Sequence, residues 1–379
     1  MSKKIGTKCV HSGNLVDDKF HGSISPIYPA TTYDYRKTDT YPRYFNTPNQ
    51  LALSRKISDL EGAEDSILFG SGLGAVSSTM FSFLKSGDHV ILHDSIYGGT
   101  INLVNTEFKK FNIDFSYIDI NDIDLLKSTI KKNTKIIYFE TPTNPLLQIV
   151  DISIISSISK ENEIISIIDN TFASPINQNP INFGIDLVIH SATKYLGGHS
   201  DILAGSVSGT KEHVEKIKKS GINYGANLSD YTVWLLERSI KTLSVRVNAQ
   251  NQNALDLAKF LEESPLIKKV YYPGLKNHLS HEIASRQMNG FGGMMSFEVI
   301  DKINSEDFVS DLKIISPTMS LAGVESSITS PSKTSHKKVD PKIRKKLGIS
   351  DNLLRFSVGI EDIEDLMLDL DKSLKNNVR

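Results

Sequence analysis

The 379-residue sequence contains a single cysteine, Cys9. One thiol cannot build an internal disulfide framework or a cysteine-rich metal site, so both are excluded. An excess of one charge is also lacking, because 43 Lys and Arg residues stand against 44 Asp and Glu residues, for a net charge of −1. Surfaces that bind nucleic acid or anionic membranes usually require clustered positive charge, so we expect neither partner.

Long apolar runs are missing as well. No stretch of 18 apolar residues predicts a membrane span. Residues 1–13 lack the apolar stretch of a signal peptide, so the expected location is cytoplasmic. A basic run near the C-terminal end is typical of a solvated surface and comprises Lys337, Lys338, Lys342, Arg344, Lys345 and Lys346.

The length exceeds the size at which one hydrophobic core usually keeps growing, so more than one domain is expected. Residues 1–49 carry Gly, Pro and Tyr without helical or strand period, which indicates an extended arm. An arm of this length needs a surface to lie on, and a neighbouring subunit is one candidate. We predict an α/β domain over residues 50–240 and a smaller α+β domain over residues 241–379. A long helical pattern from Leu228 to about Glu262 spans the boundary.

Short apolar runs alternate with helix-like segments from Ser66 onward. Continuous apolar strands between helices are typical of a mainly parallel sheet that is buried on both faces. The predicted strands of this sheet are Ser66–Phe69, His89–His93, Phe115–Ile118, Lys135–Phe139, Ile164–Ile168, Leu187–His190 and Gly205–Ser208. The predicted helices are Leu73–Leu84, Ile123–Lys131 and Ile152–Glu161, and the C-terminal part adds strands Met294–Val299 and Leu354–Val358 and a helix Glu361–Leu374.

Lys194 follows one of these apolar strands, and ligands gather outside the carboxyl ends of strands in open α/β sheets. The neighbouring hydroxyls of Ser191 and Thr193 suit phosphate oxygens, and the lysine amine suits a carbonyl group. Asp169 closes another strand. A carboxylate there could keep a pyridine nitrogen protonated, which makes the ring an electron sink. The alternatives are that Lys194 is an ordinary surface lysine and that Asp169 is the N-cap of a helix.

The segment from Gly70 to Ala75, Gly-Ser-Gly-Leu-Gly-Ala, follows a strand and opens a helix. Such a turn can bring backbone amides to a phosphate at a helix N-terminus. The same glycines fit the dinucleotide fingerprint, with Asp94 at a later strand end, so an NAD-dependent dehydrogenase is a competing hypothesis. Tyr97 could stack on a flat cofactor and move a proton, or could be a packing residue. His278 and His281 lack a third ligand nearby in the sequence, so no metal site is expected.

Taken together, the motifs resemble the Cys/Met-metabolism family of pyridoxal-phosphate (PLP) enzymes. This family includes cystathionine γ-lyase, cystathionine γ-synthase, cystathionine β-lyase, methionine γ-lyase and homoserine-ester sulfhydrylases. The resemblance runs from about Thr7 to about Asp369. The motifs that carry it are Ser71-Gly72-Leu73, Tyr97-Gly98-Gly99-Thr100, Glu140-Thr141-Pro142-Thr143-Asn144-Pro145, Asp169-Asn170-Thr171-Phe172, Ser191-Ala192-Thr193-Lys194-Tyr195, Gly198-His199-Ser200-Asp201 and Leu354-Arg355-Phe356-Ser357-Val358-Gly359.

The resemblance implies the PLP-dependent transferase fold, which is aspartate aminotransferase-like (fold type I). This fold has a mainly parallel seven-stranded sheet and a smaller α+β C-terminal domain. The implied cofactor is pyridoxal 5′-phosphate, with Lys194 as the Schiff-base lysine and acid/base. The resemblance implies that the other residues at the cofactor are Asp169, Thr171, Asn144, Tyr97, Gly72, Leu73, Ser191 and Thr193, and that those at the substrate are Arg355, Asn144 and Ser320. Arg355 would clamp the α-carboxylate of the substrate with its guanidinium fork.

Tyr41 and Arg43 resemble the Tyr-x-Arg pair that the family supplies across a dimer interface to the neighbouring cofactor phosphate. This implies a homo-oligomer, with a dimer of dimers expected. Three positions depart from the family pattern or give mixed signals. The order after Arg43 is Asn46-Thr47-Pro48 where Asn-Pro-Thr is usual. Met319 before Ser320 resembles methionine γ-lyases, whereas Gly99 resembles the cystathionine enzymes.

The expected function is therefore a PLP-dependent carbon–sulfur lyase of sulfur amino-acid metabolism. The most favoured reaction is elimination on cystathionine, which gives a thiol amino acid, a 2-oxo acid and ammonia. The alternatives within the family are γ-replacement on an O-acylhomoserine and methionine γ-elimination. In either elimination Lys194 moves protons at Cα and Cβ, and Tyr97 is a candidate donor to the leaving group.

Overall fold

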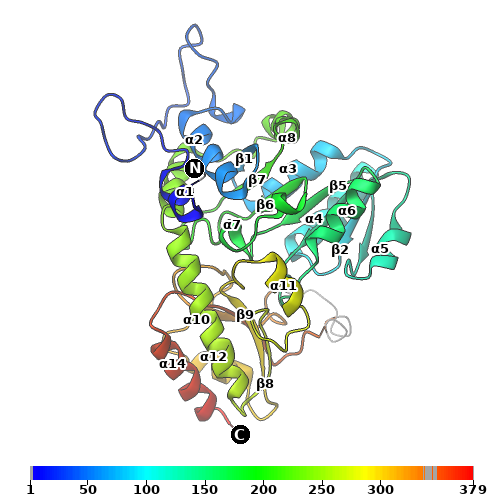
Figure 1. Ribbon diagram of the computed structural model, residues 1–379, viewed down its shortest axis with the longest axis vertical. Coiled ribbons are helices and arrows are strands. Elements are labelled where there is room, and N and C mark those ends of the chain that lie inside the picture. Colours follow the sequence, from blue (N-terminus) through cyan, green and yellow to red (C-terminus); the bar gives the residue numbers. More distant parts are fainter. Residues whose placement is uncertain (1–2, 336, 338–343, 345–347, 379) are drawn as a thin grey trace. The chain divides into compact units, whose positions relative to one another are not determined.

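The computed structural model describes residues 3–335, 337, 344 and 348–378 (Figure 1). Of the basic run near the C-terminal end, Lys338, Lys342, Lys345 and Lys346 lie outside the described residues. The chain forms two compact units. Unit 1 comprises Met1–Glu140, Val150–Gly197 and Asp201–Ser244, and unit 2 comprises Thr141–Ile149, Gly198–Ser200 and Val245–Arg379.

A seven-stranded sheet lies at the centre of the described part of unit 1, in the order β1-β7-β6-β5-β4-β2-β3. The seven strands predicted from the sequence are confirmed, and only β7 runs against the others. Their bounds are β1 Asp65–Phe69, β2 His89–His93, β3 Asp114–Ile118, β4 Thr134–Glu140, β5 Ile165–Asp169, β6 Leu187–His190 and β7 Gly205–Gly209.

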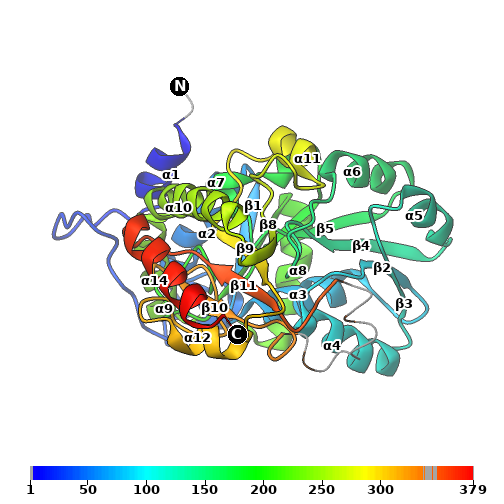
Figure 2. The same ribbon diagram turned by 90° about the horizontal axis from the view of Figure 1, so that it is seen from below.

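Helices cover both faces of this sheet (Figure 2). Successive residues of a strand point to opposite faces, so Tyr138 packs with the residues of α3, α4 and α8, whereas Ile137 packs with those of α5 and α6. Burial on both faces explains why the strands are almost wholly apolar. The bounds are α3 Gly72–Phe83, α4 Gly98–Glu107, α5 Ile123–Thr129, α6 Ile152–Glu161, α7 Ser174–Asn177 and α8 Lys211–Tyr224, with short 3₁₀ turns Phe108–Phe111 and Pro180–Phe183.

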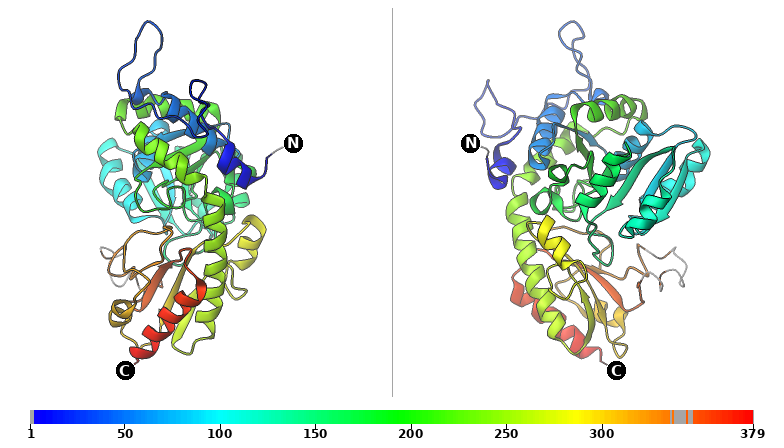
Figure 3. Two further views of the ribbon diagram at one scale, coloured as in Figure 1. Left: turned by 90° about the vertical axis from the view of Figure 1, so that its left-hand side faces the viewer. Right: turned by 45° about the vertical axis from the view of Figure 1, so that its right-hand side comes forward.

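Unit 2 contains a four-stranded antiparallel sheet among its described residues, in the order β10-β11-β9-β8. Helices α10 and α14 lie side by side along it (Figure 3). The sequence predicted β9 Met294–Val299, β11 Leu353–Ser357 and α14 Ile363–Asn376 closely, but not β8 Ile267–Tyr271 or β10 Ser327–Thr329. β8 carries two exposed lysines, and β10 is only three residues long, so neither has a clear apolar pattern. The other helices of unit 2 are α11 His281–Gln287 and α12 Ser305–Asp311.

The helical pattern after Leu228 was predicted as one helix, and this prediction is wrong. The chain forms α9 Asp230–Ile240 and α10 Leu243–Glu263. Between them the amide of Thr242 donates to the carbonyl of Ser239 at 3.2 Å, and the hydroxyl of Thr242 bonds to the same oxygen at 3.1 Å. These shorter-range bonds replace the regular helical ones and end α9.

The prediction that residues 1–49 lack helix is also wrong in part. Helix α1 spans Ile5–His11, a 3₁₀ turn spans Pro42–Tyr44, and α2 begins at Pro48 and ends at Glu61. α1 is stabilised by tertiary contacts, since Cys9 is fully buried and Lys8 donates to the carbonyl of Asp59. The unusual order Thr47-Pro48 suits the start of α2. Thr47 caps the helix through the amide of Gln50, and proline is favoured at the first helical position.

No helix within the described residues combines the length and apolar character that crossing a membrane requires.

Candidate active site

Two of the predicted site residues of unit 1 lie at or after the ends of neighbouring parallel strands. Asp169 is the last residue of β5, and Lys194 lies four residues after His190, the last residue of β6. Because β5 and β6 are paired in parallel, their carboxyl ends share one edge of the sheet. Lys194 is half-buried, and its amide donates to the carbonyl of Ser191 at 3.0 Å in a tight turn. The topology therefore brings both functional groups to the same edge.

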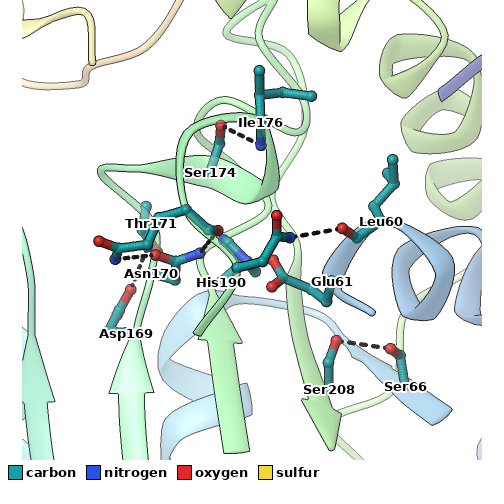
Figure 4. A network of polar contacts seen from close by, with 12 residues as sticks. Leu60, Glu61, Ser66, Asp169, Asn170, Thr171, Ser174, Ile176, His190 and Ser208 are labelled. Atoms are coloured by element: carbon teal, nitrogen blue, oxygen red, sulfur yellow. Dashed lines mark hydrogen bonds and ion pairs between the residues drawn. The ribbon is translucent and has the colours of Figure 1, made fainter. Parts of the chain in front are cut away.

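Two hydrogen bonds link the carboxylate of Asp169 to the loop after β6, and Figure 4 shows Asp169 and Thr171, which form the first of them. Its Oδ1 accepts the amide of Thr171 at 3.0 Å, and Thr171 Oγ1 accepts the amide of Ser191 at 2.8 Å. Desolvation raises the pKa of Asp169, although the Thr171 hydrogen bonds oppose the shift. No lysine or arginine of the described chain forms an ion pair with this carboxylate. A protonated ring nitrogen would supply the missing positive partner.

The first turn of α3 forms a close-fitting cradle beside the same loop. Ser71 Oγ accepts the amide of Gly74 at 2.9 Å, and the amides of Gly72 and Leu73 open the helix, where N–H groups have no partner within the helix. A Cβ at position 72 would lie 2.7 Å from Cβ of Ser191, so only glycine permits this approach. Donors at a helix start beside a serine hydroxyl fit a phosphate group.

Thr193 lies on the same loop, but its hydroxyl is already engaged. It donates to the carbonyl of Ala204 at 3.1 Å and accepts the amide of Ala204 at 3.1 Å. The hydroxyl of Thr193 could donate to a phosphate only if it gave up its hydrogen bond to the carbonyl of Ala204.

Tyr97 is the residue just before α4, and it is 54% exposed. Its amide donates to Oε1 of Glu140 at 2.8 Å, and its ring lies against Gly99, where a Cβ would collide with Cε1. Glu140 ends β4 and is buried. The sequence placed Glu140 in a family motif but assigned it no role. The signal that could have found it is a carboxylate at the end of an apolar strand.

Unit 2 contains a buried guanidinium. Arg355 lies on β11 and is only 5% exposed. Its Nη1 donates to Oδ1 of Asn144 at 3.2 Å, and its Nη2 lies 3.3 and 3.4 Å from the carbonyls of Met319 and Ser320. Burial lowers the pKa of Arg355 to about 10. Its Nε has no hydrogen-bond partner among the described residues, and no acidic side chain there pairs with it. Arg355, Asn144 and Ser320 thus meet within one unit around an unneutralised cation.

Tyr41 and Arg43 are exposed. The guanidinium of Arg43 lies 5.6 Å from the ring centroids of both Tyr41 and Tyr44, and its Nη1 donates to the carbonyl of Ile222 at 3.0 Å. Both residues belong to unit 1.

Two further features bear on the sequence predictions. Glu61 and His190 form a buried pair with Oε1 and Nε2 2.5 Å apart, which the sequence did not suggest because the partners are 129 residues apart (Figure 4). His278 accepts the amide of Ser280 at 3.2 Å, and His281 bonds to the carbonyl of Pro273. Within the described residues, no group of three metal-binding side chains occurs.

The dinucleotide hypothesis for the Gly70 loop is wrong. In a dinucleotide-binding fold the strand before the glycine loop lies at the centre of the sheet between parallel neighbours. Here β1 is an edge strand whose only sheet neighbour in the described structure is the antiparallel β7. The arrangement of lysine, carboxylate and glycine turn around this sheet instead defines an enzyme of the PLP-dependent class.

Comparison with known proteins identifies the family. A model described as Cys/Met metabolism PLP-dependent enzyme matches residues 6–375, and the chain belongs to this family. It is 44% identical to cystathionine beta-lyase of Lactococcus lactis subsp. cremoris over 98% of this chain and 99% of that one. It is 40% identical to cystathionine gamma-lyase of Bacillus subtilis over 99% and 100% of the two chains. The crystal structure of cystathionine gamma-lyase from Lactobacillus plantarum, complexed with L-serine, superposes with a TM-score of 0.94 at 38% identity, covering 98% and 99% of the chains.

Proposed function

We propose that this enzyme is a carbon–sulfur lyase that eliminates a thiol amino acid from cystathionine, with PLP attached covalently to Lys194. The observation that carries the proposal is that Asp169 and the loop bearing Lys194 lie at the carboxyl ends of two adjacent parallel strands, β5 and β6. PLP supplies an electron sink for a carbanion at the substrate Cα. The similarity to cystathionine lyases over nearly the full chain supports cystathionine as the substrate.

The residues of unit 1 fit the cofactor in charge and shape. Asp169 would hold the ring nitrogen protonated, since opposite charges in a partly buried site stabilise each other. The amides of Gly72 and Leu73 would bind the phosphate together with the hydroxyls of Ser191 and Thr193. Thr171 would keep the loop after β6 in place, because its hydroxyl accepts the amide of Ser191.

Tyr97 would stack on the ring of the cofactor, and Asn144 would lie beside it. The exposed face of Tyr97 leaves its ring accessible to a flat ligand.

Arg355 would bind the α-carboxylate of the substrate. A buried guanidinium without an acidic partner gains more from an anionic ligand than an exposed one would. Asn144 orients the guanidinium through Nη1, and the backbone of Ser320 contacts Nη2. This arrangement leaves Nε for the ligand.

The proton transfers would use two side chains. Nζ of Lys194 would remove the proton from Cα of the substrate and, for γ-elimination, move a proton at Cβ. The hydroxyl of Tyr97 would donate a proton to the leaving sulfur.

Tyr41 and Arg43 would serve the phosphate site of a neighbouring subunit, so the active form would be at least a dimer. Their exposure and their place on the arm are consistent with a role outside their own chain.

Lys194→Ala tests the assignment of the lysine. We expect the wild-type protein to be yellow and to retain its cofactor covalently after borohydride treatment. The variant should lose covalent retention, and its turnover should fall by about three orders of magnitude or more, since the nucleophile and the base are both lost. Lys211→Ala, at an exposed helix start, is the matched control and should behave as the wild type. Covalent retention or normal turnover in Lys194→Ala would refute the assignment.

The same preparations test the substrate. With cystathionine, β-elimination yields pyruvate and homocysteine, whereas γ-elimination yields 2-oxobutyrate and cysteine, each with ammonia. Release of a 2-oxo acid from methionine but not from cystathionine, or product formation only from an O-acylhomoserine with added cysteine, would refute cystathionine lysis and leave the cofactor assignment intact.

A further inference from the structure

We propose that Glu140 is a positioning residue of the active site. Its side chain is a neutral carboxylic acid that holds the backbone of Tyr97, while the neighbouring Asp169 is ionised. This inference builds on the proposed role of Tyr97 at the cofactor ring. It assigns a task to a buried carboxyl group that the proposed reaction does not otherwise use.

The contact to Tyr97 is direct. Oε1 of Glu140 accepts the amide of Tyr97 at 2.8 Å, at the residue that precedes the first turn of α4. The other end of Tyr97 is constrained by Gly99, because the ring occupies the space that a side chain at position 99 would fill. The backbone and the ring of Tyr97 are thus each contacted from one side, while more than half of the residue stays open to a ligand.

The carboxyl group of Glu140 lies beside that of Asp169. The two residues are directly paired in the parallel register of β4 and β5, so their side chains project from the same face of the sheet. Two carboxylates this close in a site with little water do not both ionise readily, and one proton is shared between them.

Local surroundings decide which of the two keeps the proton. Glu140 is 7% exposed, whereas Asp169 retains more accessible surface and accepts the amide of Thr171. Burial, and then the charge of Asp169, raise the pKa of Glu140 well above its usual range. Binding of a ring cation next to Asp169 would favour its ionised form further and leave the proton on Glu140.

Among the other titratable groups around the pair, His190 lowers the pKa of Asp169 through its charge, which favours the proton on Glu140. Tyr138 on β4 stays neutral, because burial and the two carboxyl groups raise its pKa well above 10. His93 ends β2, and burial lowers its pKa. His190 follows on β6, where it pairs with Glu61.

Three variants test the proposal with the reconstituted holoenzyme. Glu140→Gln keeps an oxygen for the Tyr97 amide and carries no charge. Glu140→Ala removes the acceptor. Glu140→Asp shortens the side chain by one methylene group and so moves the carboxyl group away from the amide of Tyr97. Ile137→Ala is the matched control, because it opens a cavity on the same strand toward the opposite face of the sheet. The readouts are cofactor affinity by equilibrium dialysis, the visible circular dichroism of the bound cofactor, and the pH titration of its visible absorbance.

We expect Glu140→Gln to match the wild type in all three readouts, since it replaces one neutral acceptor by another. Glu140→Ala and Glu140→Asp should bind the cofactor about tenfold more weakly, with reduced visible circular dichroism, because a buried N–H loses its partner. Should Glu140→Ala fail to fold, Glu140→Asp carries this comparison.

Two results would overturn the proposal. One is a shift of the absorbance titration by about one pH unit or more in Glu140→Gln, which would mean that Glu140 is charged. The other is that Glu140→Ala and Glu140→Asp match the Ile137→Ala control. Failure of the proposed function itself is distinguishable, because the wild type and the control would then also lack the visible signal that borohydride fixes.

Discussion

At the scale of single residues, each unit holds an ionisable group that forms no ion pair among the described residues. Asp169 is partly buried in unit 1, and Arg355 is almost wholly buried in unit 2. A buried charge without a partner lowers the free energy of unfolding by roughly several kcal/mol. Such groups therefore persist where a ligand supplies the partner. The Glu61–His190 pair shows the contrast, since Oε1 of Glu61 and Nε2 of His190 contact each other inside the fold.

His278 predicts a pH dependence of stability. Burial lowers its pKa to about 4 from the usual 6.5. Between these values the unfolded chain binds more protons than the folded one, so stability is complete above pH 6.5 and falls as the pH drops toward 4. His278→Gln should reduce the loss of unfolding free energy between pH 7 and pH 4.5 by about 2 kcal/mol, after allowance for the partly exposed ring.

Urea denaturation of the wild type and the variant at both pH values would measure this difference. His11→Gln, at an exposed position of α1, is the control. An equal pH dependence in His278→Gln and the wild type would contradict the prediction.

At the scale of elements, the cradle depends on how closely α3 approaches the loop after β6. Gly72→Ala places a methyl group 2.7 Å from Cβ of Ser191, and the two segments must separate. Overpacking of this kind costs roughly 1–3 kcal/mol, so we expect cofactor affinity to fall by about tenfold. Equilibrium dialysis of the cofactor is the measurement.

Gly70→Ala is the matched control for Gly72→Ala. It lies two residues away at the end of β1, and its added methyl group would have ordinary contacts of 3.5 and 3.7 Å. Equal cofactor affinities in the two variants would show that the close approach at Gly72 is not needed for binding.

At the scale of the whole molecule, the proposed role of the arm requires two copies of the chain. Arg43→Ala and Lys194→Ala should each lose most activity when pure. When the two are dissociated, mixed and reassociated, a mixed dimer contains one site with Lys194 from one chain and Arg43 from the other. Such a site should be active, which restores about a quarter of the wild-type activity in a statistical mixture.

Turnover of the mixture against the two pure variants measures this complementation. If Arg43 instead serves the site of its own chain, the mixture will show only the average of the two variants. Light scattering before and after reassociation checks that oligomers have formed again.

The sequence by itself determined the family, the strand order along the chain and the residues most suited to cofactor chemistry. The reason is local: strands buried on both faces are continuous apolar runs, and the residues at Lys194, Asp169 and Gly72 follow such runs directly. The sequence did not predict the break between α9 and α10, the helix in the arm or the strand β8. Each depends on a few hydrogen bonds or on packing that leaves little pattern in the sequence.

Only the tertiary structure decided which distant residues meet. The pairing of Glu140 with Asp169 follows from the register of two strands, and the contact of Glu61 with His190 joins positions 129 residues apart. The acceptor role of Glu140 toward Tyr97 likewise links the ends of β4 and the start of α4. Such contacts depend on the order of strands in space, which the apolar pattern of each strand does not specify.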